Sequence, residues 1–250
     1  YSANESVEKI EKHGIKTSRA EIVRFHCAAD AYYIPEKINI ITSTNTLPCE
    51  KWQRCGLFAG FTQSMHACGL LRCLAIYAHY ELGISYRSFY EGLMDYIESN
   101  NLSFIGDFYG EVKESFKGLA NGITPKFTVP YTGNLVWDHY EFMFLRANAD
   151  LDRFYDELTP YLNGIFEDKK LLSQLVSYQK AVLRKPFEET SKCETDYDFH
   201  NYFSRIYIDK YAPLEKYSMF IDGSQQLLTL ISTQIIELGL ERKAVRLNIG

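Results

Sequence analysis

The sequence has no long apolar run, no run of basic residues, few prolines and few cysteines. Its most apolar stretch, Leu57–Ala78, is interrupted by Gln63, His66 and Arg72, and the longest unbroken apolar run there is Cys73–Ala78. A helix that spans a membrane needs about 20 consecutive apolar residues. This stretch therefore predicts a buried helix and not a membrane span.

The cysteine, charge and proline contents exclude further classes of protein. Six cysteines in 250 residues are too few for a disulfide-stapled scaffold, so we expect reduced thiols and a cytoplasmic location. Lysine and arginine number 27 against 32 aspartate and glutamate, a formal net charge of −5, which argues against nucleic-acid binding. Only 7 prolines occur, a content that favours helices.

What the sequence does contain is a large apolar and aromatic core. Hydrophobic residues make up 46% of the chain, and 19 Tyr, 16 Phe and 2 Trp supply large rings. A chain of 250 residues can form one large domain or two small ones without a metal or disulfide. Because residue 1 is Tyr1 and not Met, we expect a piece of a longer protein or a chain freed of a signal peptide. Reduced cysteines favour the first explanation.

Helical patterns dominate the middle of the sequence. Residues Cys49–Leu82 predict one long or once-broken helix with three glycines as candidate weak points. These glycines are Gly56, Gly60 and Gly69. Gly83 is suited to end this helix and Ser85 to cap the next. Further helices are expected over Tyr86–Ile97, Asp107–Asn121, Leu135–Leu162 with a break near residues 148–150, and Asp168–Lys185.

Shorter elements are expected on both sides of these helices. An N-terminal helix starts at a capping box of Ser2 and Glu5 and ends at Gly14. Two β segments follow, Glu21–His26 and Lys37–Thr42. The later expected elements are a loop over Lys185–Asp198, a hairpin of Phe199–Asp209 and Lys216–Asp222, a helix over Gln225–Leu238 and a strand over Ala244–Ile249.

The predicted fold class is therefore α+β, predominantly α, in a single domain over residues 1–250. Residues 1–46 form connecting helix and β segments, and residues 47–185 form a helical core of about six helices. Residues 186–250 supply the hairpin, the last helix and the terminal strand.

No catalytic motif accompanies this fold. The glycine-rich nucleotide motifs, the nucleophile elbow and the C-x-x-C pair are all missing, and no histidine has a metal-ligand spacing. We predict no catalytic residue and no metal ligand in the chain.

Two groups of polar and aromatic residues remain as candidate sites. On an ideal helix His66, Cys73, Tyr77 and Tyr80 would share one face, which predicts either a ligand groove or a core seam. The segment His139–Glu141 near Trp137 is either a small polar site or a helix cap. The Arg87–Glu91 pair has the spacing of an ordinary surface ion pair. The candidate substrate-binding residues are His66, Tyr77, His79, Tyr86 and Arg87.

Several segments resemble the cobalamin-binding radical SAM proteins. The resemblance is moderately specific in the block from Phe61 to Leu93 and extends over most of the chain. Its segments are Glu11–Thr17, Ile38–Thr46 with Trp52, Gly69-Leu70-Leu71-Arg72, Ala75-Ile76-Tyr77, Gly83–Glu91, Trp137 with Glu141, Phe154–Leu158, Tyr178-Gln179 and Gly239–Lys243. The last of these lacks the aromatic residue that the family's terminal motif usually has.

The resemblance implies a longer enzyme with a cobalamin domain, a radical SAM barrel and a C-terminal extension. The barrel's C-x-x-x-C-x-x-C cluster motif is missing here, so the resemblance implies that this chain is the extension alone. The [4Fe–4S] cluster, S-adenosylmethionine and cobalamin would then belong to the parent protein. The extension would contact the barrel of its own parent chain and a small-molecule substrate as an accessory, non-catalytic substrate-pocket domain. The alternatives are a helical protein-interaction domain and a self-contained enzyme.

Overall fold

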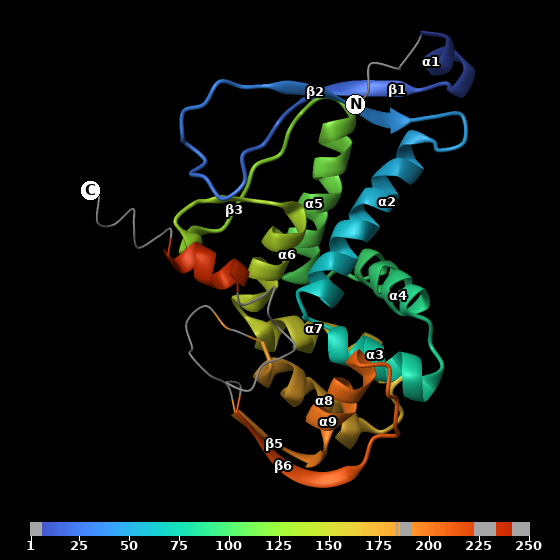
Figure 1. The fold of residues 1–250 in the computed structure, drawn as a ribbon, viewed down its shortest axis with the longest axis vertical. Coiled ribbons are helices and arrows are strands. Elements are labelled where there is room, and N and C mark those ends of the chain that lie inside the picture. The colour runs from blue at the N-terminus through green and yellow to red at the C-terminus, as the bar shows by residue number, and fades with distance from the viewer. Residues whose placement is uncertain (1–6, 184, 186–191, 223–233, 242–250) are drawn as a thin grey trace.

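The computed structural model describes residues 7–183, 185, 192–222 and 234–241 of the chain. Helices fill the centre, and two-stranded sheets lie at opposite ends of the long axis (Figure 1). The predicted class, α+β and predominantly α, is confirmed. The α-helices are α1 (Val7–His13), α2 (Cys49–Thr62), α3 (Arg72–Leu82), α4 (Tyr86–Ser99), α5 (Ile105–Ala120), α6 (His139–Asn148), α7 (Leu151–Ile165), α8 (Lys169–Ala181) and α9 (Phe199–Tyr207), with a further helix over 234–241.

The remaining elements are short. A π-helix, η1 (Gln63–Ala67), follows α2, and a 3-10 turn, η2 (Pro130–Thr132), lies between two strands. Three antiparallel pairs form the sheets: β1 (Lys16–Glu21) with β2 (Lys37–Ser43), β3 (Phe127–Thr128) with β4 (Val136–Trp137), and β5 (Lys192–Tyr197) with β6 (Lys216–Asp222). The core between residues 47 and 183 has seven α-helices where about six were expected, because both long predicted helices are interrupted.

The predicted helix Cys49–Leu82 breaks at one of its three glycines. Gly69 has φ 96°, in the left-handed region that a side chain rarely adopts. Gly56 and Gly60 lie inside α2 and are not weak points. A Cβ at Gly56 would overlap the ring of Phe116, and one at Gly60 would overlap the ring of His139. These two glycines are therefore positions of close helix packing.

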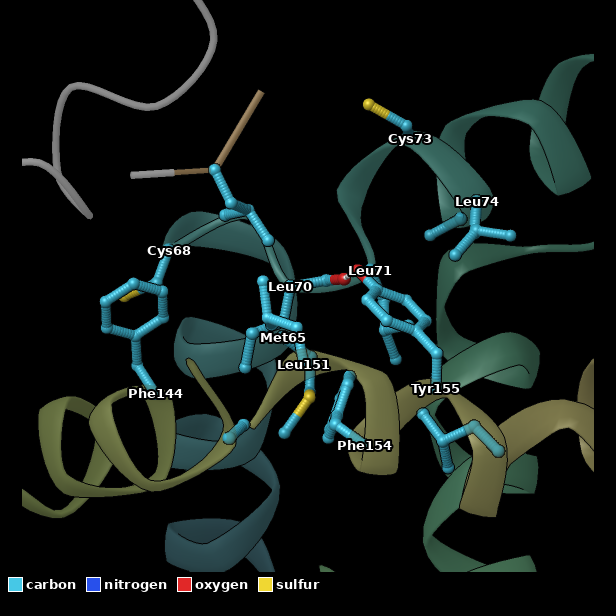
Figure 2. Close-up of a cluster of buried hydrophobic side chains, with 14 of the residues drawn as sticks. Met65, Cys68, Leu70, Leu71, Cys73, Leu74, Phe144, Leu151, Phe154 and Tyr155 are labelled. Carbon is cyan, nitrogen blue, oxygen red and sulfur yellow. Dashed lines mark hydrogen bonds between the residues drawn. The ribbon is translucent and has the colours of Figure 1, made fainter. Parts of the chain in front are cut away.

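The chain between η1 and α3 is buried in the centre of the molecule. Leu70 and Leu71 are fully buried, and the Tyr155 hydroxyl donates a hydrogen bond to the Leu70 carbonyl. Figure 2 shows this segment over α7, with Phe154 and Tyr155 beside it. The break in the helix thus becomes part of the hydrophobic core.

The predicted helix boundaries at the α3–α4 hairpin are confirmed. Gly83 ends α3 in the left-handed conformation, with φ 69°. The Ser85 side chain accepts a hydrogen bond from the Ser88 amide and caps α4. The α4 face with Phe89 and Leu93 is buried, as its helical spacing predicts.

The first predicted strand is wrong in its bounds. β1 ends at Glu21, the residue where the prediction began, whereas β2 matches its prediction to within one residue. After β1 the backbone pairs elsewhere, because the His26 amide donates to the Val136 carbonyl and the Val136 amide donates to Cys27. Residues 136–137 form strand β4, which pairs with β3, so the helix predicted from Leu135 begins at His139. Its predicted break is confirmed at residues 149–150.

The prediction for residues 185–209 is also wrong. Phe199–Tyr207 is a helix and not a strand, because Asp198 accepts a hydrogen bond from the Asn201 amide and caps it. The partner of β6 is instead Lys192–Tyr197, which lies in the predicted loop. Residues 234–241 form a helix that overlaps the end of the predicted last helix, Gln225–Leu238, and continues past it. The capping box at residues 2 and 5, residues 225–233 of that helix and the strand at 244–249 lie outside the described residues.

The packing of α2 against α6 gives a test by glycine substitution. Gly60→Ala places a methyl group against the His139 ring, so we expect the free energy of unfolding to fall by about 1–3 kcal/mol. The matched control is Gly110→Ala in α5, where a Cβ meets no atom within 4 Å. There we expect a gain of about 0.5–1 kcal/mol. Urea unfolding measures both, and a Gly60→Ala protein as stable as wild type would contradict the packing.

Candidate functional site: a cavity beside the π-helix

A cavity of about 510 Å³ opens where the end of α2, η1 and the start of α4 meet. This volume lies within the range of small-molecule sites. Its walls are mostly apolar and aromatic, with a few polar side chains. The lining residues are Phe58, Thr62, Gln63, His66, Ala67, Tyr86, Arg87 and Tyr90.

The π-helix positions three of these residues. In its wide turn the Cys68 amide donates to the Gln63 carbonyl five residues earlier, at 2.9 Å. The Arg72 guanidinium closes the turn, since its Nε donates to the His66 carbonyl at 2.7 Å and it also donates to the Ala67 carbonyl. Turns of this kind recur at functional sites.

His66 is the central polar group of the cavity. Its Nδ1 lies 2.9 Å from the hydroxyl of the buried Tyr90, and its ring meets the Tyr86 ring edge-on at 5.3 Å. Burial, and secondly the positive charge of Arg72, lower the pKa of His66 to about 4. The imidazole is therefore neutral at pH 7 and offers a hydrogen bond without a charge.

The remaining polar groups differ in their burial. Burial raises the pKa of Tyr86 to about 12, so its hydroxyl stays protonated. Arg87 lies at the mouth with 80% of its side chain exposed, and its Nε donates to Glu91 at 3.0 Å. The cavity thus has neutral walls and a single guanidinium at its edge.

The structure brings three of the five predicted site residues to this cavity: His66, Tyr86 and Arg87. His79 does not line the cavity: it is exposed, and its ring packs on Tyr86 at 4.6 Å. Tyr77 lies elsewhere and stacks on Phe166 at 5.8 Å. Sequence reasoning missed the other lining residues because nothing local marks the π-turn.

The predicted common face of His66, Cys73, Tyr77 and Tyr80 is wrong. It assumed one continuous helix, and the turn at Gly69 separates His66 from the other three. Cys73 is buried in the core, with its amide donating to the Gln179 side chain.

The segment His139–Glu141 is a helix cap, one of its two predicted alternatives. Asp138 and Glu141 form a capping box at the start of α6. Glu141 is buried and lies 3.0 Å from His26 Nε2, a contact that joins residues far apart in the sequence. It ties the segment after β1 to α6.

The cysteines do not fit an iron–sulfur cluster. Within the part of the chain that the structure describes, no three His, Cys, Asp or Glu side chains gather as a metal site. All six cysteines are free thiols. Burial raises the pKa of both Cys68 and Cys73 to about 12, which opposes the thiolate form that a cluster requires.

The sequence is similar to that of a known enzyme. In an alignment of 218 positions that covers 79% of the chain, the sequence is 27% identical to the cobalamin-dependent radical SAM methyltransferase TokK of Streptomyces tokunonensis. The chain is a distant homologue of this enzyme. It covers 32% of the relative's length. No family model matches the chain, and no described helix is long and apolar enough to cross a membrane.

The environment of His66 gives a test by titration. The folded protein holds the His66 pKa at about 4, below the ordinary 6.5, so the unfolded chain takes up this proton first as pH falls. As the pH falls from the ordinary pKa to the lowered one, protonation of His66 in the unfolded chain should reduce the free energy of unfolding by an amount on the order of 1–3 kcal/mol. His66→Gln lacks this contribution.

Two measurements check this expectation. Imidazole NMR signals that are missing in His66→Gln should titrate near pH 4 in the wild type. Urea unfolding of the two proteins at several pH values gives the difference in acid sensitivity. A titration midpoint near 6.5 would contradict the buried, neutral histidine.

Proposed function

We propose that this chain is an accessory, substrate-pocket domain of a cobalamin-dependent radical SAM enzyme, placed C-terminally and not catalytic by itself. The observation that carries the proposal is the cavity beside η1, which has the volume and mixed lining of a small-molecule site. The distant similarity to a methyltransferase of this class supports the enzyme type and suggests methyl transfer as the parent reaction.

The cofactors are proposed to reside in other parts of the parent protein. The described cysteines do not gather as a cluster site. The sequence similarity covers about a third of the relative, which has room for further domains. S-adenosylmethionine, cobalamin and the [4Fe–4S] cluster would supply the radical and methyl chemistry there, and this chain would hold the substrate.

A neutral, aromatic cavity suits such a role. Reactive intermediates need protection from water and from side reactions. Phe58, Tyr86 and Tyr90 provide apolar surface, while His66 and Gln63 provide uncharged hydrogen-bonding groups. These residues would bind and orient an uncharged part of the substrate and exclude water around it.

A second surface supports contact with the rest of the parent chain. Apolar side chains are exposed on β1–β2 and their connection: Ile22, Phe25, Tyr32, Ile34 and Ile38. Among the described residues the sheet has two strands, so each has one edge without a strand partner. We propose that the parent's barrel covers this face. The same exposure also favours the alternative function, a domain that binds another protein.

Filling the cavity in the full-length parent protein tests the pocket. Ala67→Phe puts a ring into the cavity, so we expect transfer of labelled methyl groups from S-adenosylmethionine to metabolites to fall at least about tenfold. Cleavage of S-adenosylmethionine without substrate should persist. The matched control is Ala149→Phe at the exposed end of α6, which should behave as wild type. Equal methyl transfer by a folded Ala67→Phe protein would refute the pocket.

Deleting residues 1–250 from the parent separates the alternatives. The pocket proposal expects loss of methyl transfer, with S-adenosylmethionine cleavage retained by the remaining domains. Unchanged methyl transfer would favour the protein-interaction domain. Turnover by residues 1–250 alone would indicate a self-contained enzyme and contradict the accessory role.

A further inference from the structure

A carboxylate surrounded by tyrosines lies at the far end of α3 from the π-helix. One Glu81 oxygen accepts hydrogen bonds from the hydroxyls of Tyr202 at 2.9 Å and Tyr211 at 3.1 Å. These tyrosines come from α9 and from the segment after it, more than a hundred residues along the chain. The tertiary fold therefore assembles this cluster.

The position of Glu81 is electrostatically unfavourable for a carboxylate. It lies in the last turn of α3, where the carbonyl ends of the helix carry partial negative charge and favour cations. Within the described residues no lysine or arginine forms an ion pair with it, and its recorded partners are tyrosine hydroxyls. These neutral donors hold the carboxylate in place without neutralising it.

The surrounding rings add a second attraction for a positive charge. Tyr80 and Tyr211 are exposed and stack at 5.2 Å, and Tyr77 packs on Tyr202 at 6.3 Å. The face of an aromatic ring attracts a cation, more strongly where water is excluded. The pKa of Tyr202 is raised by burial and then by Glu81, so its hydroxyl remains a donor.

We propose that Glu81, with Tyr80, Tyr202 and Tyr211, forms a binding site for an organic cation, an ammonium or guanidinium group. The carboxylate supplies the opposite charge and the exposed rings supply the walls. Such a cation could belong to a small molecule or to a lysine or arginine side chain of a polypeptide. This site is separate from the cavity beside η1 and does not depend on the proposed function.

Titration of the 250-residue chain with small probes tests the proposal. The cationic probes are tetramethylammonium chloride and the peptide acetyl-Gly-Lys-Gly-amide. Tert-butyl alcohol is the neutral probe of similar shape, and sodium chloride controls for ionic strength. NMR of labelled tyrosine rings reports binding at Tyr80 and Tyr211, with concentrations up to about 100 mM to cover weak cation–aromatic contacts.

We expect saturable shifts with a cationic probe and none with the alcohol. Glu81→Gln keeps the shape and removes the charge, so it should weaken binding at least about threefold. Tyr211→Phe keeps the ring and should bind better than Tyr211→Ala. Circular dichroism confirms that each variant is folded. Tighter binding of the peptide would identify a polypeptide source, and tighter binding of tetramethylammonium a small molecule.

Three results would overturn the proposal. The first is the absence of saturable shifts with both cations, and the second is equal shifts with tert-butyl alcohol. The third is unchanged binding to folded Glu81→Gln, since the charge is then not involved.

Discussion

The interruption between α2 and α3 is the constraint on which the rest of the structure depends. A continuous helix over Cys49–Leu82 would lack the turn at Gly69 that places Leu70 and Leu71 in the core. Before this turn, α2 continues into the π-helix η1. The Arg72 guanidinium donates hydrogen bonds to the carbonyls of His66 and Ala67 at the end of η1. A guanidinium is well suited to this because it offers several donors in a fixed plane. The same arrangement places His66 opposite Tyr90 and so creates the cavity.

Contacts between aromatic rings connect this cavity to the cation site. Tyr86 lines the cavity and packs on His79, which packs on Tyr80 at 5.0 Å, and Tyr80 stacks on Tyr211. The Tyr211 hydroxyl then binds Glu81. His79, Tyr80 and Tyr86 lie on the α3–α4 hairpin, where the short turn at Gly83 brings His79 against Tyr86, whereas Tyr211 comes from the segment after α9. A hairpin with a longer loop would place His79 and Tyr86 less firmly against each other.

Local sequence signals predicted the fold well where local interactions determine it. Gly83 and Ser85 mark helix ends through backbone conformation and a side-chain cap, and both act within a few residues. The strand prediction failed at Phe199–Tyr207, because the buried residues of this segment have the i, i+3, i+4, i+7 spacing of a helix and Asp198 caps it. It failed again at Lys192–Tyr197, a polar strand whose partner is distant in sequence.

The candidate site shows the same limit. The residues His66, Tyr86 and Arg87 were found from their chemical character, but their shared cavity depends on a π-turn that no local pattern marks. The contacts His66–Tyr90 and His26–Glu141 join residues 24 and 115 positions apart. Such pairs form only after the helices have packed. Residue types therefore suggested a site, whereas tertiary packing decided which of them meet.

The protonation states of the cavity walls bear on how it would select a ligand. His66 has a pKa of about 4 and Tyr86 one of about 12, so between these values neither group changes its charge. If the cavity binds a ligand as proposed, discrimination inside it would rest on shape and on uncharged hydrogen bonds, whose loss leaves a buried polar group unpaired. The charged side chains of this region lie outside it: Arg87 is exposed at the mouth, and Glu81 is half-buried beyond the row of rings. A ligand with an uncharged body could thus be selected in the cavity independently of any charged group that stays outside it.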